Sequence, residues 1–183
     1  MTAIGVVNGP GGIAIGADSC ITWGPSKRRT DGKLLMDGPW AFAAAGAQEA
    51  VVWLREHRPA QEPQEDAATY VQRIGPLIRA WLAECDDPHD RRDAMILIAH
   101  CDGAAWALPA RSGVAHLIRG CFGAGDSTAV EAAFLAARPW RGTNAEALLD
   151  ALTACAEVCA GVCHPIRVAR WSAENGAWEV IGG

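Results

Sequence analysis

Long apolar runs and basic clusters are both scarce in this sequence. None of its 183 residues falls in a stretch apolar and long enough to cross a bilayer, which takes about 20 residues. The start also lacks the basic and then apolar segments of a signal peptide, so a cytoplasmic location is expected. Acidic residues outnumber basic ones by 21 to 16, and basic residues cluster only at Lys27–Arg29 and Arg91–Arg92. The sequence therefore predicts no binding to nucleic acid or membrane.

The cysteine content excludes a simple disulfide framework. There are seven cysteines, an odd number, and in a cytoplasmic protein they are expected to be reduced thiols. Cys155, Cys159, Cys163 and His164 lie close together in sequence, but structural zinc ligands usually come in paired turns. We interpret these cysteines as buried thiols on a helix and expect neither a metal nor another cofactor.

Apolar periodicity predicts strands and helices in distinct blocks. Short apolar runs between turn residues predict strands at Ala3–Val7, Ile13–Ala17, Lys33–Met36, Trp40–Ala45, Ala94–Ala99, Ala104–Leu108, Val114–Ile118, Ile166–Trp171 and Trp178–Ile181. A helical period predicts helices at about 50–58, 65–83, 127–137 and 145–160, the second kinked at Gly75-Pro76. Because strict strand–helix alternation is absent, we predict a single α+β domain over 1–183. Its two antiparallel sheets form a four-layer α-β-β-α sandwich, each sheet covered by a helix pair.

Three polar residues near predicted strand ends are candidates for chemistry. Thr2 would hold both a nucleophile and a base if Met1 were removed, because its hydroxyl could attack while its α-amine accepts the proton. Lys33 could favour the deprotonated hydroxyl, and a buried ammonium would need a carboxylate such as Asp18. Taken singly, these residues have ordinary interpretations, namely a Thr after the initiator Met, a turn-forming Asp and a solvated Lys.

Gly46 lies where an apolar strand changes into a helix. Backbone N–H groups at such a junction are unpaired and could form an oxyanion hole. An ordinary strand-to-helix glycine is the alternative. Cys20 lies near these candidates in sequence and could line a pocket.

The order of these motifs resembles that of proteasome β-subunits. The resemblance rests on Thr2–Val7, on Ile15–Ser19 with Thr22, on Lys33-Leu34 and on Ala43–Gly46, and weaker likeness continues through Asp93–Ala99 and Gly123–Gly125. The bacterial peptidase HslV and the small bacterial proteasome-homologue groups are similar. The resemblance implies the N-terminal-nucleophile (Ntn) hydrolase fold.

The resemblance also implies roles for particular residues. Thr2, Asp18 and Lys33 would form the catalytic triad and Gly46 the oxyanion hole, while Thr22 would align the substrate as an added strand and Ala44 would shape the specificity pocket. Ala124 stands where the family usually has a serine that positions the N-terminal amine. Ser127 could replace that serine, and Glu157 could be the late acidic residue that supports the threonine.

These features predict a threonine-type endopeptidase in a self-compartmentalising ring. We expect self-association into a stacked double ring, with unfolded protein or peptide as substrate. A separate ATPase unfoldase could assist, since the chain has no phosphate-binding loop of its own. Trp53, Trp81 and Trp140 would either pack within the chain or contact neighbouring subunits. A small-molecule amidase or acylase of the Ntn group and an inactive structural ring are the alternatives.

Overall fold

A computed structural model describes residues 2–23, 26–29, 32–46, 49–84, 94–125 and 127–182, with the backbone alone at 21–23, 26–29, 127 and 128. Two five-stranded antiparallel sheets form its centre. The first has the order β10 (Gly120–Gly125), β1 (Ala3–Asn8), β2 (Ala14–Ala17), β11 (Arg167–Ser172) and β12 (Ala177–Ile181). The second has the order β5 (Leu34–Asp37), β6 (Trp40–Ala45), β7 (Met95–His100), β8 (Ala105–Pro109) and β9 (His116–Ile118). A separate hairpin joins β3 (Cys20–Trp23) to β4 (Ser26–Arg29).

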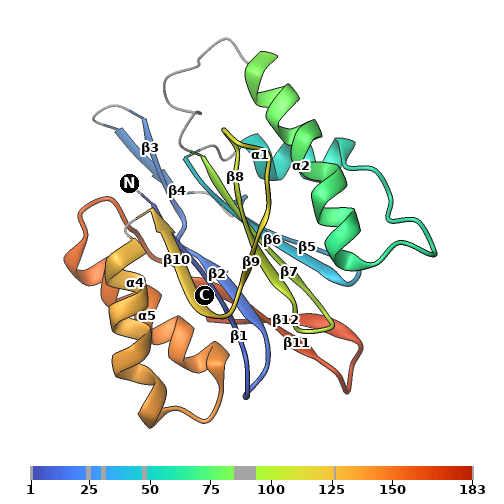
Figure 1. The fold of residues 1–183 in the computed structure, drawn as a ribbon. Helices are drawn as coiled ribbons and strands as arrows, with labels where there is room; N and C mark the ends of the chain where they lie inside the picture. The colour runs from blue at the N-terminus through green and yellow to red at the C-terminus, as the bar shows by residue number, and fades with distance from the viewer. Residues whose placement is uncertain are drawn as a thin grey trace.

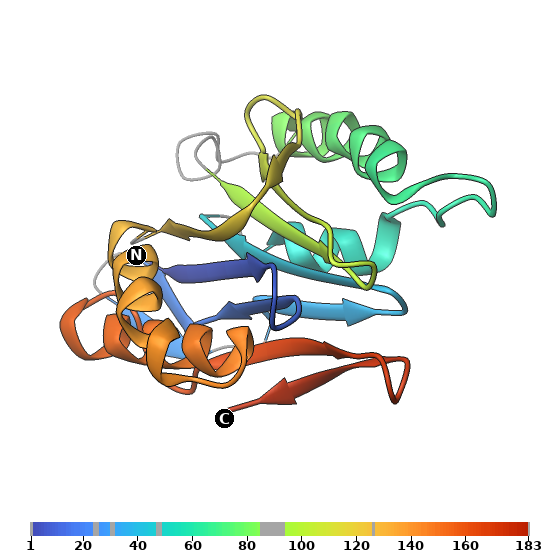
Figure 2. The ribbon, with the colours of Figure 1, turned by 60° about the horizontal axis from the view of Figure 1, so that its bottom comes forward.

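The helices cover the outer faces of the two sheets (Figure 1). Helices α1 (Glu49–His57) and α2 (Ala67–Glu84) pack on the second sheet, and the helix α2 continues through Pro76. Helices α4 (Ser127–Ala137) and α5 (Asn144–Val158), joined by a short 3₁₀ segment (Arg138–Trp140), pack on the first sheet. Figure 2 shows the resulting four layers from the side, and the predicted α-β-β-α sandwich is confirmed.

Three apolar clusters hold the four layers together. The central cluster joins the two sheets through residues such as Ile4, Ile15 and Leu97. The outer clusters lie beneath α1 and α2 on one side and beneath α4 and α5 on the other. A strand such as β6 contributes to two clusters, with Ala41 in the central one and Phe42 in an outer one, because successive side chains of a strand point to opposite faces.

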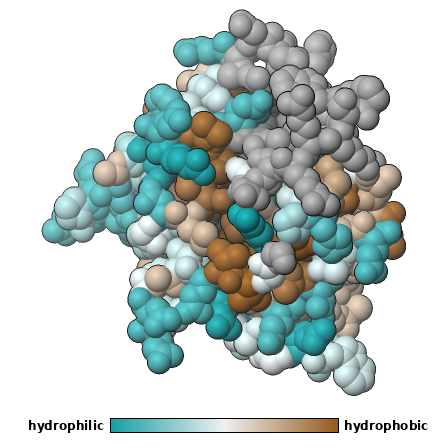
Figure 3. All heavy atoms as spheres, turned by 180° about the vertical axis from the view of Figure 1, so that it is seen from behind, coloured by the Kyte–Doolittle hydropathy of each residue, from teal (hydrophilic) through white to brown (hydrophobic). Residues whose placement is uncertain are grey.

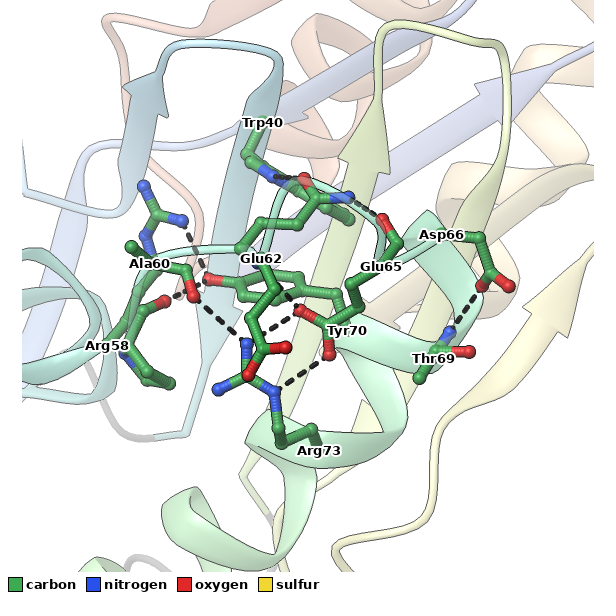
Figure 4. A network of polar contacts seen from close by, with 11 residues as sticks. Trp40, Arg58, Ala60, Glu62, Glu65, Asp66, Thr69, Tyr70 and Arg73 are labelled. Atoms are coloured by element: carbon green, nitrogen blue, oxygen red, sulfur yellow. Dashed lines mark hydrogen bonds and ion pairs between the residues drawn. The ribbon is translucent and has the colours of Figure 1, made fainter.

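The connection between α1 and α2 is held by a polar network (Figure 4). The guanidinium of Arg58 donates to the Tyr70 hydroxyl at 2.7 Å, and Arg73 donates twice to Glu65, at 2.8 and 2.7 Å. Arg73 also donates to the carbonyl of Ala60 at 3.0 Å. Arg58 and Arg73 both lie near the Tyr70 ring, which adds cation–π attraction. This network ties the segment between α1 and α2 to the first half of α2.

Three of the strands in the described part of the chain were not predicted. The strand β10 is rich in glycine, yet it pairs with the whole of β1, from Ala3 opposite Gly125 to Asn8 opposite Gly120. The hairpin strands β3 and β4 are short, and the second is strongly basic in sequence. The predicted strand Val114–Ile118 is shorter in the structure, beginning at His116.

Apolar side chains are mostly interior. In the described ranges, no helix combines the length and apolarity needed to cross a membrane. The exposed large apolar residues include Leu135, Trp140 and Val158. Figure 3 shows apolar side chains gathered near the middle of one face, with hydrophilic side chains around them.

Candidate active site

The ends of three strands bring Thr2, Asp18 and Lys33 together. Thr2 precedes β1 and Asp18 follows β2, and these two strands are antiparallel neighbours, with Ile4 opposite Ala17. Asp18 and Thr2 therefore lie at the same end of the first sheet. Lys33 precedes β5 in the second sheet, where its carbonyl accepts a hydrogen bond from the N–H of Ala44 at 3.2 Å. The candidate site thus lies between the two sheets.

The ammonium of Lys33 bridges the other two side chains. It donates to the Thr2 hydroxyl oxygen, and it lies 2.7 Å from Asp18 Oδ1. All three residues are buried, with exposed fractions of 9% for Thr2, 2% for Asp18 and 4% for Lys33. A buried ion pair of this kind is stable only when its members are also hydrogen-bonded.

Hydrogen bonds from the backbone fix the Asp18 carboxylate. Its Oδ1 accepts from the N–H of Ala3 at 3.1 Å, and its Oδ2 accepts from the N–H groups of Cys20 at 2.9 Å and Cys163 at 3.2 Å. Both oxygens are thus held by donors from separate segments of the chain. This carboxylate can hold the Lys33 ammonium in one place against Thr2.

The Thr2 hydroxyl has a defined environment. Its oxygen accepts from Lys33, and its single proton can go to Asp18 Oδ1 at 3.3 Å or to the carbonyl of Cys20 at 3.4 Å. An ammonium that donates to a hydroxyl oxygen favours the alkoxide form of that hydroxyl. The arrangement can therefore generate an oxygen nucleophile.

Gly125 allows β10 to approach Thr2. It lies opposite Ala3 and has a φ of +85°, and a Cβ added to it would lie 1.8 Å from the Thr2 carbonyl oxygen. Only glycine fits so close to another backbone. The neighbouring Ala124 lies opposite Ile4 and is buried in the central cluster between the sheets.

The other predicted site residues lie on several different elements. Gly46 directly follows β6 and is exposed, with a φ of +84°. Ala44 is 1% exposed and belongs to the cluster beneath α1 and α2. Glu157 is exposed on α5, and within the described part of the chain it makes no hydrogen bond to Thr2, Asp18 or Lys33.

For the remaining two residues the backbone alone is described. Thr22 lies on β3, where it is opposite Lys27. Ser127 is the first residue of α4, directly downstream of the β10 strand that flanks β1.

Sequence reasoning missed the contact of Cys163 with the site. Cys163 donates to Asp18 through its backbone, and its carbonyl accepts from the Ser19 N–H at 3.2 Å. Since a backbone N–H carries no residue signature and 145 positions separate the two partners, no sequence pattern could have revealed it. In the part of the chain that the structure describes, no three His, Cys, Asp or Glu side chains gather as a metal site.

Comparisons with known proteins place the fold among proteasome-like structures. The chain resembles Thiobacillus denitrificans BPH, a bacterial proteasome homologue, with a TM-score of 0.76 and 22% identity over 94% of this chain and 100% of that one. The same protein in complex with epoxomicin matches with a TM-score of 0.76 and 21% identity, over 93% of this chain and 98% of that one. The Anbu (Gly-1) mutant from Hyphomicrobium sp. strain MC1 matches with a TM-score of 0.75 and 14% identity, over 100% of this chain and 87% of that one. No family model matches the chain, and no curated protein matches it by sequence.

Proposed function

We propose that this chain is a threonine-type endopeptidase with Thr2 as its nucleophile. The observation that carries the proposal is the contact of the Lys33 ammonium with both the Thr2 hydroxyl and the Asp18 carboxylate. The proteasome-like fold supports it, because N-terminal-nucleophile hydrolases combine a hydroxyl and an α-amine in the same first residue.

Removal of Met1 is part of the proposal. The α-amine of Thr2 then becomes the general base, and an ordinary α-amino pKa near ~8 suits proton transfer around neutral pH. The Thr2 hydroxyl attacks the substrate carbonyl carbon, and its proton passes to this amine directly or through water. The resulting acyl-enzyme ester is hydrolysed in a second step.

Lys33 and Asp18 have supporting roles in this mechanism. Lys33 stabilises the developing alkoxide on Thr2, and its positive charge also keeps the nearby α-amine neutral. Asp18 keeps Lys33 charged and in place through the 2.7 Å ion pair. Both functions need the low dielectric of a buried site, and the side chains of Lys33 and Asp18 are 5% and 0% exposed.

Substrate binding is assigned to the segments that surround Thr2. Gly46 supplies the oxyanion N–H, and its exposed position after β6 leaves its backbone accessible. Thr22 on β3 aligns the peptide as an added strand, and Cys20 contributes to the pocket. Ser127 positions the amine, because Ala124 stands where the family usually has a serine for that role. Ala44, which is buried beneath α1 and α2, is given no part in the pocket. A strand edge suits this form of recognition, because backbone hydrogen bonds bind peptides of many sequences.

We further propose that the chain assembles into rings that stack in pairs. The exposed apolar residues on the outer helices support this, with Trp140 84% exposed. Trp53 and Trp81 instead stack on each other with ring centroids 5.7 Å apart, so they contribute packing within the chain. Light scattering should give a mass many times the 19.3 kDa of one chain, whereas a monomer would favour the amidase alternative.

Hydrolysis of a fluorogenic peptide tests the function. Replacement of Thr2 by Ala should lower turnover by about a thousandfold or more, and Lys33→Ala should be nearly as damaging. Thr2→Ser should keep part of the activity, because the hydroxyl and the amine both remain. The double variant should be little worse than either single one, since members of one catalytic unit are not additive. Wild-type turnover by Thr2→Ala would disprove the threonine mechanism.

A further inference from the structure

Two cysteines lie on either side of the buried Asp18 carboxylate. The N–H of Cys20 donates to Asp18 Oδ2 at 2.9 Å, and the N–H of Cys163 donates to the same oxygen at 3.2 Å. The two backbone nitrogens are therefore no more than about 6 Å apart, the sum of these two lengths, so the two residues are close neighbours in space. Ser19, next to Cys20, donates from its N–H to the Cys163 carbonyl at 3.2 Å.

The two thiols also contact each other. Both cysteines are free, and the Cys20 thiol is hydrogen-bonded to the Cys163 side chain. Cys20 is 1% exposed, whereas Cys163 is partly exposed. Burial raises the pKa of the Cys20 thiol, and the Cys163 contact raises it further, so Cys20 is a protonated thiol at neutral pH. The pair therefore consists of one accessible sulfur and one protected sulfur in contact with it.

We propose that Cys20 and Cys163 form a reversible disulfide that switches off the Thr2 centre under oxidising conditions. The disulfide itself follows from the geometry of the pair, while its effect on hydrolysis rests on the proposed function.

Hydrogen peroxide is the oxidant for this step. The thiolate of Cys163, the more exposed residue, attacks the peroxide O–O bond, which gives a sulfenic acid on Cys163 and releases hydroxide. The Cys20 thiol then loses its proton to a hydroxide and its sulfur attacks the Cys163 sulfur, which forms the S–S bond and releases a second hydroxide. The two protons lost by the thiols convert the hydroxides to water, so one peroxide is reduced and two thiols are oxidised.

The disulfide would disturb the site because both cysteines position its residues. Thiols in van der Waals or hydrogen-bond contact must still close to about 2 Å to form an S–S bond. That movement pulls on Cys20, whose carbonyl lies 3.4 Å from the Thr2 hydroxyl, and on both N–H groups that hold Asp18. A displacement of about 1 Å in a catalytic group can cost about a hundredfold in rate, so we expect a loss of that order.

Peptide mapping of the oxidised full-length protein tests the disulfide. The reduced protein is treated with hydrogen peroxide, its remaining thiols are blocked with N-ethylmaleimide, and it is digested without reductant. We expect a cross-linked peptide that contains Cys20 and Cys163, lighter by two hydrogens than the sum of its parts and separated by dithiothreitol. Absence of this peptide after oxidation would overturn the proposal.

Peptide hydrolysis before and after oxidation tests the switch, with each variant compared with its own reduced form. Wild type should lose about a hundredfold in rate and regain it with dithiothreitol. Cys163→Ser should lose far less, and Cys121→Ser should respond as wild type does, because Cys121 has no contact with the site among the described residues. A cross-link that leaves the wild-type rate unchanged, or equal inactivation of Cys163→Ser, would refute the switch. If the reduced wild type hydrolyses nothing while the cross-link forms, the peptidase function fails and the disulfide stands.

Discussion

The close approach of β10 to Thr2 gives a sharp test of the site. Replacement of Gly125 by Ala adds a Cβ that would lie 1.8 Å from the Thr2 carbonyl oxygen and 2.8 Å from its carbonyl carbon. Ordinary van der Waals contact begins near 3.4 Å, so one of the two strands must move by about 1.6 Å, the difference between the two distances. A shift of about 1 Å in a catalytic group can cost about a hundredfold, so we expect at least that loss of peptide hydrolysis.

Gly120→Ala is the matched control for this change. Gly120 lies on the same strand with nearly the same φ, +84° against +85°, but a Cβ added there has no neighbour within 4 Å. Both variants carry the strain of a left-handed alanine, of order 1–3 kcal/mol, whereas only Gly125→Ala displaces Thr2. Hydrolysis rates and urea unfolding of the two variants separate these effects. Equal rates for the two variants would refute the reasoning.

The remaining predictions concern charge and thiol reactivity. Asp18→Asn should lower the free energy of unfolding in urea by about 3–5 kcal/mol, because it leaves the buried Lys33 ammonium without its carboxylate. Asp150→Asn is the control, because the more exposed ion pair of Asp150 with Arg141 should contribute only about 0–1 kcal/mol to the free energy of unfolding. An equally small effect of Asp18→Asn would contradict a stabilising buried pair. Burial, with a smaller effect of the Glu131 charge, raises the pKa of the Cys121 thiol to about 12. Iodoacetamide at pH 8 should therefore leave Cys121 unlabelled, and the labelling rate should rise only as the pH approaches the pKa of this thiol. Labelling at pH 8 as fast as in the unfolded protein would contradict the raised pKa.

The sequence contained enough information for the fold and for much of the site. Helical and alternating periods located the four α-helices and nine of the strands that the structure describes, because those segments bury a regular apolar face. Thr2, Asp18 and Lys33 have ordinary interpretations when taken singly, and they could be singled out together because their order resembles that of proteasome β-subunits. Their convergence in the structure follows from the pairing of β1 with β2 and from the position of β5 in the facing sheet.

What the sequence could not reveal depends on contacts between distant segments. The strand β10 has little apolar periodicity, and its strand conformation comes from pairing with β1. The donation from Cys163 to Asp18 joins residues 145 positions apart through a backbone N–H. Ala44, expected in a pocket, is buried in the cluster beneath α1 and α2, because alternate residues of β6 face opposite sides of the sheet.

Intact mass spectrometry of the purified protein, before and after incubation with epoxomicin, tests the central claim most directly. Epoxomicin is the compound bound in the Thiobacillus denitrificans BPH complex that this chain resembles. The account predicts a chain that lacks Met1 and gains the mass of one epoxomicin, with Thr2→Ala gaining none. A chain that retains Met1 and stays unmodified would contradict the proposal that Thr2 is an N-terminal nucleophile.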